Sequence, residues 1–153
     1  MAISWALACL PVPETWRMRR RTGAALALLC AARLAVALVP FRMWRGTLGM
    51  AGADMPQAGD QTKAALYARH VERAAARLPF TTKCLPRAMA LSWMLCHARL
   101  PHAVVFAVRP EGLRADGDAL HAWVEVAGKR ILGDLPEPWH AAFRLGQALN
   151  CEE

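Results

Sequence analysis

The residue pattern of this chain changes character at Pro101, and that change limits the folds open to it. Before Pro101, residues 61–78 and 82–99 repeat apolar side chains at helical spacing. After it, residues 103–108 and 120–126 are short apolar or alternating runs that are typical of strands. Helices followed by an antiparallel sheet predict an α+β domain in which the central helix packs on the sheet.

The second helical segment is apolar on most of its faces, which predicts that it is buried. We expect Pro79 to end the preceding helix and Thr81 or Thr82 to cap the buried one. Pro86 is tolerated in the first turn, where a backbone N–H would be unpaired anyway. The buried helix should extend to about Arg99.

Charge and turn residues divide the chain near residue 50. Residues 1–50 hold seven arginines and one acidic residue, whereas residues 51–153 are almost balanced. A glycine-rich connector over residues 46–61 lies between them. We therefore expect a basic, apolar helical segment over 1–50, able to dock a partner, and a catalytic domain over 51–153. The chain lacks the basic, aromatic-interleaved motifs of RNA- or DNA-binding folds, so no nucleic-acid partner is expected.

Residues 22–39 form the most apolar stretch, and eighteen residues are just enough to span a bilayer. Arg33 lies in the middle of the stretch, however, and many of its residues are alanines. A packed or partner-facing helix is therefore preferred to a transmembrane span, and weak association with a membrane surface stays an alternative. The stretch starts too late, and lacks the cleavage site, for a signal peptide.

The five cysteines form neither a CxxC pair nor a metal-binding spacing. An odd number without a disulfide framework favours a reducing cytoplasm. Cys30 and Cys96 are expected to be small buried apolar residues.

Cys84, His121 and Asp134 are the candidate catalytic residues. Cys84 opens the buried helix, where unpaired backbone N–H groups and the helix dipole stabilise an anion. His121 lies on a predicted strand, and Asp134 follows a turn at Ala127 and Gly128 and a short further strand. A thiolate, an imidazole base and a carboxylate that fixes the base's tautomer are the groups needed to hydrolyse an amide.

Alternation along the strand places His121, Trp123 and Glu125 on one face and an apolar set on the other. Each candidate taken alone has a structural interpretation: a buried cysteine, a satisfied histidine, a turn aspartate. Their combination in one domain favours a catalytic site. Asp116 and Asp118 are rivals of Asp134 by residue type, but they precede His121 in a loop and are poorer candidates.

Two strings of residues carry a resemblance to a known family. Cys-Leu-Pro-Arg-Ala-Met-Ala-Leu at residues 84–91, and His-Ala-Trp-Val-Glu-Val at residues 121–126 followed by Gly128, resemble the transglutaminase-like cysteine peptidases of lasso-peptide biosynthesis. The likeness covers roughly residues 60–135 and implies a transglutaminase-like, papain-like fold. It also implies that Cys84 is the nucleophile, His121 the general base and acid, and Asp134 the residue that orients His121.

The resemblance implies a leader peptidase that cuts a ribosomally made precursor peptide before a macrolactam is closed. Nothing in residues 1–50 resembles the family's winged-helix-like leader-recognition module. The chain should therefore depend on a separate leader-binding protein and pass its product to an ATP-dependent cyclase. This chemistry needs no metal and no organic cofactor. The alternatives are an acyltransferase, in which an amine instead of water takes the acyl group, and a non-catalytic scaffold.

Overall fold

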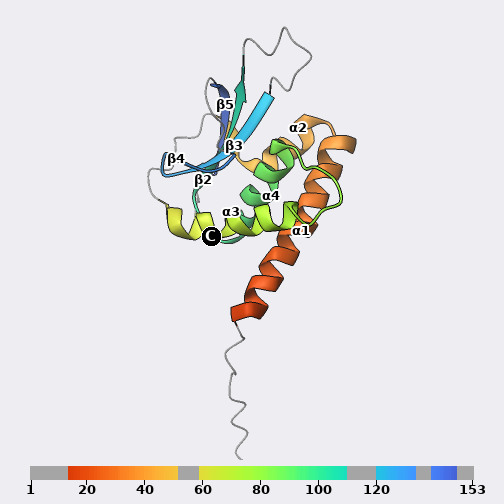
Figure 1. Ribbon diagram of the computed structural model, residues 1–153. Coiled ribbons are helices and arrows are strands. Elements are labelled where there is room, and N and C mark those ends of the chain that lie inside the picture. Colours follow the sequence, from red (N-terminus) through yellow and green to blue (C-terminus); the bar gives the residue numbers. More distant parts are fainter. Residues whose placement is uncertain (1–13, 52–58, 110–119, 134–138, 148–153) are drawn as a thin grey trace, which may run out of the picture.

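The computed structural model describes residues 14–51, 59–109, 120–133 and 139–147. Four α-helices and a five-stranded antiparallel sheet confirm the α+β prediction (Figure 1). The elements in chain order are α1 (Glu14–Leu38), α2 (Phe41–Trp44), the 3-10 helix η1 (Arg45–Leu48), β1 (Met50–Ala51), α3 (Gln61–Ala75), α4 (Cys84–His97), β2 (His102–Val108), β3 (Leu120–Val126), β4 (Lys129–Leu132) and β5 (His140–Gln147). The strand order in the sheet is β1-β5-β2-β3-β4.

Helix α4 lies at the centre of the molecule. It contacts α1 and α3 on one side and strands β2 and β3 on the other. Most of its side chains are buried, as its apolar composition predicts. The sheet meets it with Val104 from β2 and with Ala122, Val124 and Val126 from β3, all members of the main core. The two faces predicted for β3 are thereby confirmed.

The start of α4 differs from the prediction for a physical reason. The N-cap is Lys83 and the helix begins at Cys84, so the prediction that a threonine caps it was wrong. Pro86 has no N–H to donate to the carbonyl of Thr82, so a helix that began one residue earlier would lose its first hydrogen bond. The Thr82 hydroxyl instead accepts a 2.9 Å hydrogen bond from Arg87 Nε.

The end of α4 is a Schellman motif. Leu100 N donates to Leu95 O and Arg99 N to Cys96 O, both at 2.9 Å. Arg99 takes a positive φ of 53° at the position where glycine is usual. The helix therefore ends at His97, two residues before the predicted end. Cys96 is exposed, which makes the expectation of a buried thiol there wrong.

Helix α3 is shorter than its apolar pattern suggests. The Asp60 side chain caps its start by accepting a 2.9 Å hydrogen bond from Lys63 N. The helix ends at Ala75 rather than near Leu78. Pro79 cannot donate to the Ala75 carbonyl, and it disfavours the helical conformation at the residue before it.

The hairpin between β3 and β4 turns through Ala127 and Gly128, as predicted. Both residues have positive φ, 46° and 74°, which matches the right-handed twist of the strands. Strand β5 was not predicted, although it pairs with both β1 and β2 inside the sheet. Its sequence has no β-branched residue and little alternation.

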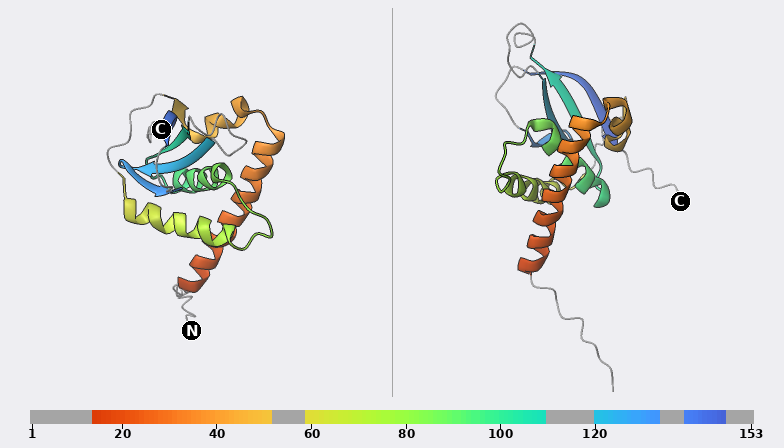
Figure 2. Two further views of the ribbon diagram at one scale, coloured as in Figure 1. Left: turned by 45° about the horizontal axis from the view of Figure 1, so that its top comes forward. Right: turned by 90° about the vertical axis from the view of Figure 1, so that its right-hand side faces the viewer.

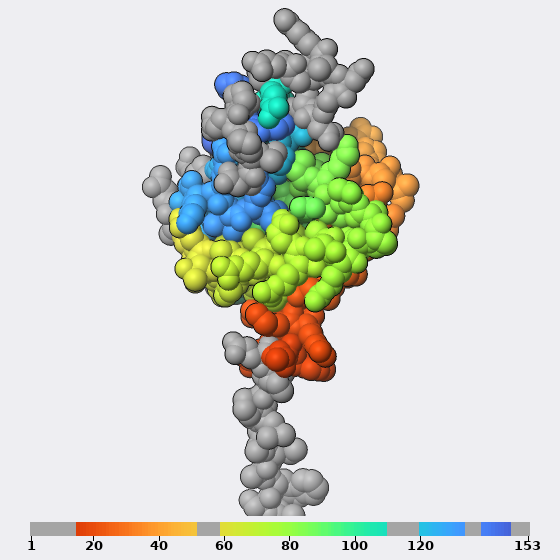
Figure 3. All heavy atoms as spheres, in the orientation of Figure 1, coloured from red at the N-terminus to blue at the C-terminus, as the bar shows by residue number. Residues whose placement is uncertain are grey.

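Helix α1 packs along a narrow stripe of buried residues, Thr22, Ala25, Leu29 and Ala32. Their spacing of three or four residues places them on one side of the helix, against α3 and α4 (Figure 2). The first turns project from the body of the molecule (Figure 3). By length and composition residues Thr15–Leu38 could cross a membrane, but core helices of soluble proteins pass the same test.

The segment before residue 50 is part of the common core. Trp44 and Leu48 belong to the same cluster of buried residues as α3, α4 and the sheet. Strand β1 extends the sheet by pairing Met50 with Gly146 and Ala51 with Leu145. The N-terminal helices are thus bound to the rest of the chain by apolar burial.

His102 is a fully buried titratable group at the start of β2. Its Nδ1–H donates a 2.8 Å hydrogen bond to Leu100 O. Its Nε2 accepts a 2.7 Å hydrogen bond from the Ser92 hydroxyl. Burial lowers the pKa of His102 below 6.5, and the hydrogen bond to Leu100 opposes that shift only in part. Burial therefore favours the neutral ring in the folded protein.

We expect the free energy of unfolding to fall as pH drops below 6.5. The unfolded chain binds a proton at this histidine more readily than the folded chain, so stability is present above pH 6.5 and is lost toward the lower, folded pKa. The maximum slope for one group is about 1.4 kcal/mol per pH unit. Urea unfolding of wild type and His102→Gln between pH 5.5 and 7.5 measures how the free energy of unfolding changes with pH. Equal slopes in both proteins would contradict the assignment, and the lowered pKa of His70 accounts for a residual slope.

Candidate active site

Cys84 is the first residue of α4, with its side chain half-buried. Its Sγ atom lies 4.0 Å from the carbonyl oxygen of Leu120, the residue before His121. No side chain caps this helix N-terminus. The thiol is therefore beside backbone N–H groups that can stabilise negative charge on sulfur or on a bound oxygen.

His121 is held in place by a backbone group. Its Nε2 lies 2.8 Å from the carbonyl oxygen of Gly133. A carbonyl oxygen only accepts, so Nε2 must carry the hydrogen, and in the neutral ring Nδ1 is left as an acceptor. This is the arrangement that a general base needs, with one nitrogen fixed as a donor and the other able to take a proton.

Gly133 reaches His121 because the chain passes very close to β3. Its φ is +86°, and a Cβ atom there would lie 3.0 Å from both the Ala122 oxygen and the Trp123 Cβ. Any other residue would be strained at this φ, and its Cβ atom would be in tight contact with the strand. Gly133 is a site residue that sequence reasoning missed, and the signal that pointed to it was its position directly before Asp134.

Asp134 itself lies outside the described residues, as do Asp116 and Asp118. The orienting role expected of Asp134 therefore stays a prediction. The acceptor that the structure gives to His121 is the carbonyl of the residue immediately before it.

Two tryptophans surround the His121 ring. The centroid of Trp139 lies 5.1 Å away and that of Trp123 lies 6.0 Å away. Trp123 Nε1 donates a 2.6 Å hydrogen bond to Glu125 Oε1, and the Arg109 guanidinium lies 4.6 Å from the centre of the Trp139 ring. These contacts hold the two tryptophan rings in place beside the imidazole. Trp139 carried no sequence signal, because it follows a segment without a predicted element.

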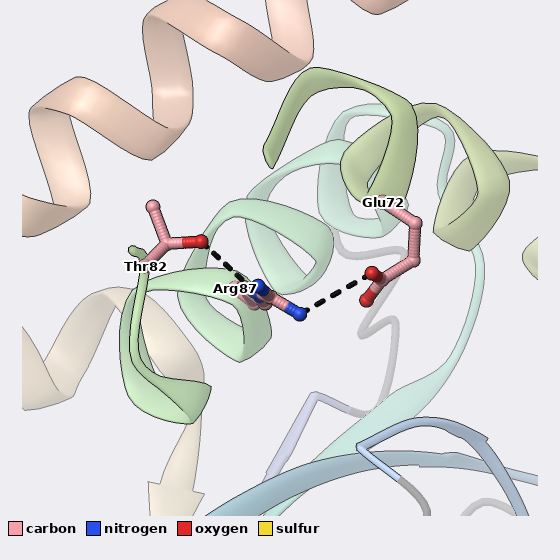
Figure 4. A network of polar contacts seen from close by, with 3 residues as sticks. All are labelled: Glu72, Thr82 and Arg87. Carbon is pink, nitrogen blue, oxygen red and sulfur yellow. Dashed lines mark hydrogen bonds and ion pairs between the residues drawn. The ribbon is translucent and has the colours of Figure 1, made fainter. Parts of the chain in front are cut away.

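Arg87 ties the first turn of α4 to its surroundings (Figure 4). Its Nε donates to the Thr82 hydroxyl at 2.9 Å, and its Nη1 lies 3.3 Å from Glu72 Oε2 on α3. Both ends of the ion pair are partly exposed, so it contributes at most about 1 kcal/mol to stability. The Arg87 side chain thus connects the first turn of α4, which also carries Cys84, to the loop before α4 and to helix α3.

Cys84 and His121 line the same cavity, which has a volume of about 320 Å³. Helix α2 and strands β2 and β5 complete its wall with apolar side chains. The structure thus brings two of the three expected catalytic residues to one place. In the described part of the chain, no group of three or more His, Cys, Asp and Glu side chains could hold a metal ion.

One comparison with known proteins identifies the kind of domain. The family model described as the transglutaminase-like superfamily matches residues 25–144. No curated protein and no solved structure matches the chain significantly. The matched range includes α1 from Ala25 onward as well as Cys84, His121 and most of β5.

We expect the neutral His121 ring to carry its hydrogen on Nε2, because the Gly133 carbonyl can only accept. The ¹⁵N chemical shifts of the histidine ring nitrogens at pH 8 distinguish the two tautomers. The ¹⁵N signals that are missing from the spectrum of His121→Gln belong to His121. Gly133→Ala should shift it, since the added Cβ displaces the carbonyl. A ring protonated on Nδ1 in the wild type would contradict the assignment.

Proposed function

The chain belongs to the transglutaminase-like superfamily, and we propose that it is a cysteine peptidase that removes the leader from a lasso-peptide precursor. The superfamily consists generally of cysteine hydrolases and acyltransferases. The leader-peptidase assignment is supported by the residue strings at 84–91 and 121–126. One observation supports the catalytic part of this proposal. Cys84 and His121 line the same cavity, and the hydrogen bond to Gly133 fixes the tautomer of His121.

The proposed reaction begins when the Cys84 thiolate attacks the carbonyl carbon of the peptide bond at the leader–core junction. The carbonyl oxygen gains negative charge, which the backbone N–H groups of Cys84 and Leu85 at the start of α4 stabilise. Pro86 has no N–H and contributes none. His121 takes the proton of the Cys84 thiol and passes it to the leaving amine, which becomes the new N-terminus of the core peptide.

Water then completes the hydrolysis. His121 takes a proton from the water molecule as it attacks the thioester, and the leader is released with a free carboxylate. We propose Asp134 as a further group that orients the imidazole, acting beside the Gly133 carbonyl. No step in this sequence requires a metal or an organic cofactor.

We propose that the peptidase acts in the cytoplasm with two partners. A separate winged-helix-like protein would bind the leader, and an ATP-dependent cyclase would receive the cut core peptide. The three described cysteines are free thiols, which supports a reducing compartment. The outer side of α1 exposes Leu34 and Leu38, at 58% and 76% of their surface, and offers the leader-binding protein a docking surface.

Acyl transfer is the alternative within the same chemistry. The thioester on Cys84 would be captured by an amine instead of water, with the same nucleophile and the same base. The mass of the product separates the two, because hydrolysis adds one water and transfer joins two molecules. A non-catalytic scaffold is the second alternative, and it requires an unreactive Cys84. Weak membrane association through residues 22–39 would use the same exposed side of α1.

We expect one cut in a candidate lasso precursor incubated with this protein and a purified leader-binding protein. Mass spectrometry should show both fragments with wild type and neither with Cys84→Ala or His121→Ala, because nucleophile and base are each required. Asp134→Asn should stay folded and lose rate through a wrong imidazole tautomer. A precursor left uncut by wild type, in a demonstrated ternary complex, would favour the scaffold.

The docking role of α1 is tested without deleting it, since its other side is in the core. Leu34→Ser with Leu38→Ser should weaken binding of the leader-binding protein about tenfold, as burial of two leucines is lost. Titration calorimetry measures the affinity. Leu66→Ser on α3 is the control at another exposed leucine. Unchanged affinity in the α1 variant, with unchanged thermal stability, would exclude this surface.

A further inference from the structure

The cavity beside Cys84 has an aromatic wall that the proposed hydrolysis does not use. Phe106 on β2 and Phe143 on β5 are cross-strand neighbours, and their rings stack with centroids 4.4 Å apart. Phe41 on α2 meets both rings edge-on, each at 6.1 Å. Trp44 closes the aromatic cluster, 4.8 Å from Phe41.

This wall is fixed by contacts outside the cavity. Trp44 Nε1 donates to Val39 O at 3.1 Å, and the Thr47 hydroxyl donates to Trp44 O at 2.7 Å. The same hydroxyl accepts from Trp93 Nε1 on α4 at 2.9 Å, and Thr47 O accepts from Gln147 Nε2 on β5. The segment that carries Phe41 and Trp44 is therefore held to both α4 and the sheet, so the cavity is formed before a ligand arrives.

The chemistry of the lining defines what fits. Apart from Cys84 and His121, all the lining side chains are apolar. A charged group placed there would lose its hydration without gaining a partner. A volume of about 320 Å³ is at the lower end of ligand pockets, large enough for one big side chain and too small for a folded element. Phe41 and Phe143 remain 42% exposed, which leaves apolar surface for an occupant to cover.

We infer that this cavity is a specificity subsite for one large apolar side chain of the substrate, on the acyl side of the cleaved bond. The inference rests on the proposed function and adds the substrate class. Cys84 lines the cavity, and the acyl half of the substrate is bonded to its sulfur from the first attack until water releases it. A side chain held in the cavity therefore positions the reacting carbonyl for attack and for hydrolysis.

The test uses peptide chloromethyl ketones that vary the two residues before the ketone among Leu, Phe, Ala and Asp. The Cys84 thiolate forms a thioether with the methylene carbon and chloride leaves. At one of the two positions Leu or Phe should give an inactivation rate constant about 10- to 100-fold above that of Ala, with Asp slower still. Mass spectrometry must place the label on Cys84, because Cys96 is also exposed.

Iodoacetamide separates failure of this inference from failure of the proposed function. It reports the reactivity of the thiol without using a subsite. If Cys84 reacts with neither iodoacetamide nor any peptide probe, the proposed function fails. If Cys84 reacts with iodoacetamide and with all the peptide probes at rates within about threefold of one another, the subsite is overturned and the nucleophile stands.

Two variants alter the cavity without touching the catalytic pair. Ala142→Leu, at the β5 bulge that faces the cavity, should fill it and remove the preference for Leu and Phe. Phe143→Ala should enlarge it and shift the preference from Leu toward Phe. Leu66→Ala is the matched control, since Leu66 has the same 42% exposure as Phe143 but lies outside the cavity. Unchanged selectivity in both cavity variants, with normal iodoacetamide rates, would overturn the subsite.

Discussion

The burial of α4 between the sheet and the two long helices is the constraint on which the rest of the structure depends. The helix is apolar on nearly every side, so it is stable only where all its faces are covered. Strands β2 and β3 cover one side, and α1 and α3 cover the other. Since Pro86 limits the residue at which the helix can begin, burying α4 also places Cys84 beside the first residue of β3.

The second candidate catalytic group is positioned by backbone geometry. His121 lies on the strand that covers α4, and its ring is oriented by the carbonyl of Gly133. That carbonyl reaches the ring because the chain after β4 passes so close to Trp123 that a Cβ atom at Gly133 would lie only 3.0 Å from the Trp123 Cβ. The His121 tautomer is therefore set by a close chain crossing. Cys84 lies beside β3 although it is 36 residues before Leu120, the first residue of that strand.

Local sequence patterns predicted the elements whose signals were strong. Strand β3 was predicted with the bounds that it has, β2 within one residue, and the tight turn at Ala127 and Gly128 was predicted at the right place. The errors came from effects of longer range. The cap of α4 was displaced by the missing N–H of Pro86, and β5 was overlooked because its residues pair inside the sheet without a strand pattern of their own.

The sequence by itself determined the fold class and the buried helix, and it singled out Cys84 and His121 as candidate catalytic residues, because these follow from periodicity and from residue chemistry within short segments. Only the tertiary structure decided that the Gly133 carbonyl holds His121, and that Phe41, Phe106 and Phe143 form one aromatic wall beside Cys84. Those contacts join residues from different elements. Their geometry depends on strand register and chain crossing, which local periodicity does not encode.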